Sequence, residues 1–178
     1  MQHDLFSSLD SLLSSPAGAG GFLVRDLAGQ YRPAETEEIL LAAQRLLASQ
    51  LRGNDVMSSP AVVKDFLRTR LGQLPHEVFA VVHLDSQNRV IDYVEMFRGT
   101  VSQTSVYPRE VVRDAMSRNS SALLLVHNHP SGTPEPSRAD EALTQTLKAA
   151  TALVDVRVLD HFIVTAHSIQ SMAERGLV

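Results

Sequence analysis

The sequence contains no cysteine, which excludes disulfides, thiolate zinc sites, iron–sulfur clusters and cysteine nucleophiles together. Any bound metal must therefore be held by histidine and carboxylate side chains. The chain also lacks an excess of positive charge. Its formal net charge of −4 and its pI near 5.9 give no overall attraction to phosphate backbones, so nucleic-acid binding would have to rest on a local basic patch.

Long apolar runs are absent as well. No segment approaches the roughly 18 consecutive apolar residues that span a bilayer, and the first residues lack the basic region and apolar core of a secretion signal. We therefore expect a soluble, cytoplasmic protein with no membrane partner. The length of 178 residues and the hydrophobic content of 44% are sufficient for one domain with a core and a small helical extension.

The order of the expected elements predicts an α/β fold. Residues 1 to about 33 include a stretch rich in Gly, Ala and Ser and predict a flexible arm or an irregular lead-in. Apolar spacing of three and four residues indicates helices, and alternating or continuous short apolar runs indicate strands. The expected elements are helices over 35–51 and 60–72, a hairpin over 76–97, a helix over 108–117, a strand over 122–126, a helix over 137–152 and strand structure over 154–166.

A group of metal-ligating residue types follows the strand at 122–126. His127 and His129 lie two positions apart at its end and would present both imidazoles to one side. Asp140 falls in the first turn of the next helix, where a carboxylate is favourable. Three such ligands leave a fourth tetrahedral position for water, as in catalytic zinc sites. The spacing alone leaves open an incidental His-x-His and an ordinary helix cap formed by Ser137 and Asp140.

These residues match a known motif. His127-x-His129, seven intervening residues, Ser137, two residues and Asp140 reproduce the JAMM (MPN+) metalloprotease motif. Further residues make the chain most similar to the RadC branch of that family, over about residues 60–178. They are the run HNHPSGTPEPSRAD from His127, Gly99-Thr100, Pro108–Val111 and Asp160-His161.

The resemblance implies a mixed-sheet MPN/JAB (cytidine-deaminase-like) α-β-α sandwich, and residues 1–55, which lie outside it, add an N-terminal helical extension. We therefore expect an N-terminal arm and helix, residues 1–55, and an MPN/JAMM (RadC-like) domain, residues 56–178. It also implies one Zn²⁺ per chain, held by His127, His129 and Asp140, with Ser137 stabilising the oxyanion on the attacked carbonyl. The alternative for Ser137 is a helix cap alone.

The resemblance further implies a general acid/base at the start of the strand that follows an early helix, which here is Glu77. The alternatives are that Glu77 is a solvated strand-end carboxylate, or that Glu95 or Glu110 acts instead. Asp160-His161 is expected either to support the metal ligands or to pack in the core. Of these, a core histidine with its hydrogen bonds satisfied is the simpler interpretation.

The leading hypothesis is a zinc-dependent hydrolase that cleaves a peptide or isopeptide bond in an unidentified peptide or protein substrate. One alternative is a DNA-repair-associated accessory protein that binds DNA. Its basic patch would be Arg109, Arg113 and Arg118, although a solvated helix face explains these residues equally. The other alternative is a non-catalytic MPN scaffold. Scaffolds of that kind have typically lost motif ligands, which this chain keeps.

Overall fold

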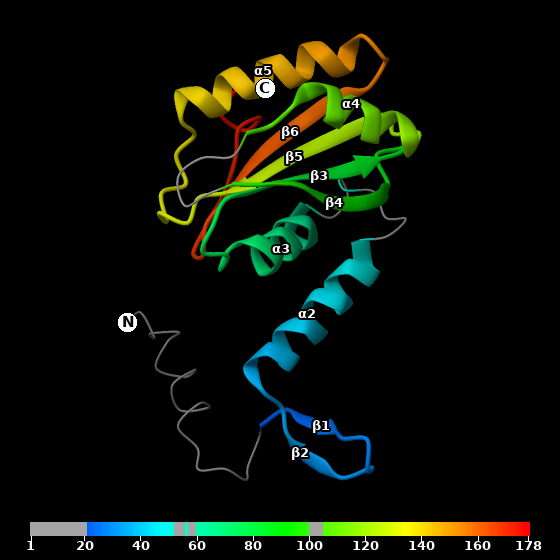
Figure 1. Cartoon of the computed structure of the whole chain (residues 1–178), viewed down its shortest axis with the longest axis vertical. Coiled ribbons are helices and arrows are strands. Elements are labelled where there is room, and N and C mark those ends of the chain that lie inside the picture. The colour runs from blue at the N-terminus through cyan, green and yellow to red at the C-terminus, as the bar shows by residue number, and fades with distance from the viewer. Residues whose placement is uncertain (1–20, 52–55, 57–59, 100–104) are drawn as a thin grey trace, which may run out of the picture. The chain divides into compact units, whose positions relative to one another are not determined.

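The computed structural model describes residues 21–51, 56, 60–99 and 105–178 (Figure 1). The chain forms two compact units that divide between Ala43 and Gln44. In the first unit, strand β1 (Leu23–Arg25) pairs antiparallel with β2 (Tyr31–Pro33). Helix α2 (Thr36–Leu51) begins in the first unit and ends in the second.

The β1–β2 hairpin shows that the irregular lead-in predicted for residues 21–33 is wrong. The turn is built locally: the Asp26 carboxylate accepts the Gln30 N–H at 2.8 Å, and Gly29 adopts a φ of +82°. Asp and Gly stabilise such turns through side-chain acceptance and left-handed backbone, respectively. Strands of three residues have no apolar periodicity that would have revealed them. Residues 1–20 of the predicted arm lie outside the described residues.

The second unit contains, among its described residues, a five-stranded sheet in the order β4-β3-β5-β6-β7. Strands β5 and β6 are parallel, and the other neighbours are antiparallel, so the sheet is mixed as predicted. The parallel pair requires a crossover, which α5 supplies. The elements are β3 (Val78–Leu84), β4 (Val90–Arg98), β5 (Ala122–Asn128), α5 (Arg138–Ala152), β6 (Arg157–Val164) and β7 (Ile169–Ser171).

Helices cover both faces of this sheet (Figure 1). Helix α3 (Pro60–Leu71) lies on one face, and α4 (Pro108–Ser117) and α5 lie on the other. Strands β3 and β5 are buried along their whole length, because their alternate side chains enter two separate apolar clusters. This arrangement confirms the α-β-α sandwich. Within the described part of the chain, we find no helix with the length and apolar character needed to cross a membrane.

Candidate metal centre

The carboxyl end of β5 brings both histidines of the His-x-His pair to one place. His127 is in the strand, on the face covered by α5, and is only 7% exposed. His129 lies just beyond the strand end, where its backbone N–H donates to the Val164 carbonyl of β6 at 2.8 Å. Gly132, with a φ of +82°, then turns the loop back toward α5.

Asp140 occupies the first turn of α5 and forms a capping box with Ser137. The Ser137 hydroxyl accepts the Asp140 N–H at 3.2 Å, and one Asp140 carboxylate oxygen accepts the Ser137 N–H at 2.7 Å. The helix cap is therefore real. It leaves the other oxygen, Oδ1, 3.1 Å from His127 Nε2, so capping and placement of Asp140 beside the histidines coexist.

The side chains of His127, His129 and Asp140 converge. The two Nε2 atoms are 2.8 Å apart, and Asp140 Oδ2 is 3.6 Å from His129 Nε2. A tetrahedral zinc ion with bonds of about 2.0–2.1 Å holds its ligand atoms about 3.3 Å apart. The three separations in the cluster, 2.8, 3.1 and 3.6 Å, lie on both sides of that value. The separations and the N/O donor set fit a zinc ion.

Backbone geometry sets the orientation of the His129 ring. Its Nδ1 lies 2.8 Å from the Thr133 carbonyl oxygen. A carbonyl can only accept, so Nδ1 carries a proton. Once Nε2 has given up its own proton, that nitrogen presents a lone pair toward His127 and Asp140. This is the tautomer that a metal ligand requires.

The cluster also has the charge that a cation needs. Burial alone would raise the pKa of Asp140, but hydrogen bonds with His127 and His129 outweigh burial and hold that pKa well below its usual range. In return, the hydrogen bond to Asp140 raises the pKa of His129, with smaller contributions from the Thr133 carbonyl and the Glu77 carboxylate. An ionised carboxylate therefore faces the two imidazoles.

Glu77 lies at the edge of this cluster. It directly precedes β3, in which Phe79 pairs with His127. The Glu77 backbone carbonyl accepts the Gly99 N–H at 2.9 Å. It is half-buried, and its charge acts on His129.

The two other candidate bases have partners elsewhere. Glu95 on β4 pairs with Arg70 of α3 at 2.9 Å, on the opposite face of the sheet. Glu110 on α4 pairs with Arg109 and Arg113. Neither is brought to the histidine cluster.

Asn128, between the two histidines, ties the cluster to the segment around Glu77. Its side-chain oxygen accepts the Val78 N–H at 2.7 Å, and its amide nitrogen donates to the His76 carbonyl at 3.0 Å. Its side chain is buried on the face opposite His127. This residue was not predicted from the sequence, although a polar amide at the end of a buried strand is a signal for such a bond.

The Asp160-His161 pair divides between the two faces of β6. His161 is fully buried, with Nε2 2.8 Å from His127 Nδ1 and Nδ1 2.7 Å from the Thr144 hydroxyl. Asp160 instead accepts the Ser171 hydroxyl at 2.6 Å near the C-terminus. Thr144 was missed in the sequence, although it lies four residues after Asp140 and therefore on the same side of α5.

Burial shifts the pKa values of this pair in opposite directions. It raises the pKa of Asp160, against the hydrogen bonds that this carboxylate accepts. It lowers the pKa of His161 well below the usual value, with the neighbouring His127 acting in the same direction. His161 is therefore neutral at neutral pH.

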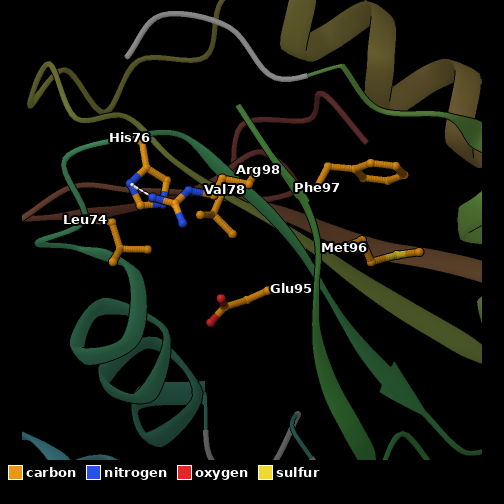
Figure 2. Close-up of a pocket in the computed structure, with 7 residues that line it drawn as sticks. All are labelled: Leu74, His76, Val78, Glu95, Met96, Phe97 and Arg98. Carbon is orange, nitrogen blue, oxygen red and sulfur yellow. Dashed lines mark hydrogen bonds between the residues drawn. The ribbon is translucent and has the colours of Figure 1, made fainter. Parts of the chain in front are cut away.

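A cavity of about 340 Å³ lies near the ends of β3 and β4, and no candidate metal ligand lines it. Figure 2 shows His76 and Arg98 pointing toward each other, with the imidazole Nδ1 and the guanidinium 3.4 Å apart. Val78, which also lines the cavity, belongs to the apolar cluster between the sheet and α3. The lining residues are Leu74, His76, Val78, Glu95, Met96, Phe97 and Arg98.

The sandwich and its His-His-Asp cluster define a JAB-type domain, and comparison with known proteins agrees. Residues 57–177 match the family model of the RadC-like JAB domain. A UPF0758 protein of Leptothrix cholodnii is 53% identical over 175 residues, which cover 94% of this chain and 79% of the relative. A UPF0758 protein of Methylibium petroleiphilum is 54% identical, with coverage of 98% and 78%. The chain belongs to the RadC family.

Proposed function

We propose that this protein is a zinc-dependent hydrolase of amide bonds in peptides or isopeptides. The observation that carries the proposal is the convergence of His127 Nε2, His129 Nε2 and the Asp140 carboxylate at zinc-ligand separations. A bound zinc ion would polarise the attacked carbonyl and lower the pKa of a water molecule toward neutrality. Three protein ligands leave the open position that such chemistry needs.

Glu77 is the proposed general acid/base. Two observations support this proposal: Glu77 directly precedes β3, in which Phe79 pairs with His127, and its negative charge raises the pKa of His129. It would accept the proton that water loses as its oxygen bonds to the carbonyl carbon. It would then return that proton to the leaving nitrogen as the C–N bond breaks, so the products are a carboxylic acid and an amine, which become carboxylate and ammonium when the acid's proton passes to the amine.

Ser137 is the proposed oxyanion donor. Its Oγ uses a lone pair to accept the Asp140 N–H, and the hydroxyl proton remains for donation. The residue is exposed at the N-terminus of α5, where the helix dipole also favours developing negative charge. The same side chain would thus support the cap and donate to the oxyanion.

The contacts of α4 favour hydrolysis over the DNA-binding alternative. Arg109 and Arg113 pair with Glu110, and Arg118 pairs with Asp114. These ion pairs fit a solvated helix face better than a phosphate-binding patch. The non-catalytic scaffold is disfavoured because every residue of the motif is retained.

The test compares wild type with Glu77→Gln in a cleavage screen of peptide and isopeptide libraries, with zinc content measured on the same samples. Glu77→Gln should keep its zinc and lose turnover, because the amide cannot exchange the proton. The matched control is Glu95→Gln, which alters a carboxylate on the opposite face of the sheet and should keep both. Full activity in Glu77→Gln would contradict the assigned base, and absence of zinc from wild type would contradict the whole proposal.

A further inference from the structure

A buried chain of hydrogen bonds connects one candidate metal ligand to the backbone of another. From His127 Nδ1 it runs 2.8 Å to His161 Nε2, and from His161 Nδ1 2.7 Å to the Thr144 hydroxyl. The hydroxyl lies 2.6 Å from the Asp140 carbonyl oxygen, one helical turn earlier. Both His161 and Thr144 are fully buried.

The direction of these bonds decides which His127 nitrogen can bind a metal. A threonine hydroxyl has one proton, and donation to the Asp140 carbonyl leaves its lone pairs for the N–H of His161 Nδ1. With this proton on Nδ1, the buried imidazole of His161 accepts at Nε2, and His127 donates to it from Nδ1. His127 Nε2 consequently keeps its lone pair, directed at His129 and Asp140.

The opposite direction would remove that lone pair. If Thr144 donated to His161, then His161 would donate to His127, and the proton of His127 would sit on Nε2. That atom could no longer act as a ligand. The two histidines of the cluster therefore depend on different hydrogen-bond acceptors. For His129 the acceptor is a backbone carbonyl. For His127 it is His161, whose own N–H is accepted by the Thr144 hydroxyl.

We propose that His161 and Thr144 are positioning residues that set His127 to bind zinc through Nε2. This inference rests on the proposed function, because it assumes that zinc binds the cluster. Core packing is the competing explanation, since His161 also makes an edge contact with Phe79 at a ring distance of 5.9 Å. A packing role depends on side-chain shape, whereas the positioning role depends on an acceptor at each step.

The first experiment measures zinc affinity by competition with a chromophoric chelator. Thr144→Val keeps the shape but removes the acceptor, and we expect zinc to bind about 10- to 100-fold more weakly, as is typical when a partner of a ligating histidine is lost. Thr144→Ser retains the hydroxyl and should restore wild-type affinity. Thr151→Val is the matched control, because Thr151 is buried on the same helix and its hydroxyl donates to the Lys148 carbonyl at 3.4 Å.

A second pair of variants keeps the test valid if Thr144→Val fails to fold. His161→Gln offers an amide oxygen to His127 Nδ1, and His161→Leu offers none, so only the second should lose zinc affinity. In zinc-loaded wild type, ¹⁵N spectra should show the proton of His161 on Nδ1. Equal affinities within both pairs, or a proton on Nε2 of His161, would overturn the positioning role alone. A wild type without zinc affinity would overturn the proposed function as well.

Discussion

Substitution of Ser137 separates its two roles at the start of α5. As N-cap, its hydroxyl accepts the Asp140 N–H at 3.2 Å, and Ser137→Ala should lower the free energy of unfolding by about 1 kcal/mol. In a chain of this size, that loss corresponds to a fall in Tm of about 2–4 °C. In its proposed role as oxyanion donor, the same hydroxyl would contribute about 10²- to 10³-fold to kcat, which Ser137→Ala should also remove.

Ser137→Gly distinguishes these contributions. Glycine is tolerated at an N-cap and costs only a few tenths of a kcal/mol, but it supplies no donor. We therefore expect both variants to lose the same activity while only Ser137→Ala loses appreciable stability. The assays are thermal unfolding and single-turnover cleavage at matched zinc content. If Ser137→Gly keeps wild-type kcat, Ser137 acts through the cap and the oxyanion role is refuted.

Three further predictions concern the scaffold. Because burial raises the pKa of Asp160, the folded state holds its proton more tightly than the unfolded state, so the contribution of Asp160 to stability should slope downward as pH rises from the unfolded pKa through the folded one. Asp160→Asn should remove that slope from the free energy of unfolding, measured in urea from pH 3 to 7, which is about the range of carboxyl titration. The same dependence on pH in wild type and Asp160→Asn would contradict the raised pKa of Asp160. Leu147→Ala, in the fully buried face of α5, should cost about 2–5 kcal/mol in the same assay, and a loss below about 1 kcal/mol would contradict tight packing. Gly72→Ala should destabilise by about 1–3 kcal/mol, because the new Cβ would lie 2.6 Å from the Arg68 carbonyl and 2.8 Å from that of Thr165; unchanged stability would show that the backbone yields there.

The main elements could be predicted because their signals are local. Pro108 and the apolar spacing after it predict α4 correctly, and the continuous apolar run at 122–126 marks the buried core of β5. The strands that were missed, β1, β2 and β7, have three residues each. No periodicity can emerge over so short a segment, so their pairing depends on turns and neighbours instead.

The candidate ligands could be proposed from spacing, but their surroundings could not. His127, His129 and Asp140 are close in sequence and belong to a motif of fixed spacing. The position of His161 depends on the parallel register of β6 against β5, in which it pairs with Leu125 and shares the face of His127. Thr144 contributes only because α5 packs that side against β6. Such partners follow from tertiary pairing, which sequence spacing does not specify.

The proposed metal centre can be tested by the zinc content of protein purified without chelator, measured by mass spectrometry for wild type, His129→Ala and the exposed-histidine control His167→Ala. We expect about one zinc per chain in wild type and in His167→Ala, as for a single mononuclear site, and loss of that zinc in His129→Ala. Zinc absent from wild type, or retained in full by His129→Ala, would contradict zinc binding by these ligands.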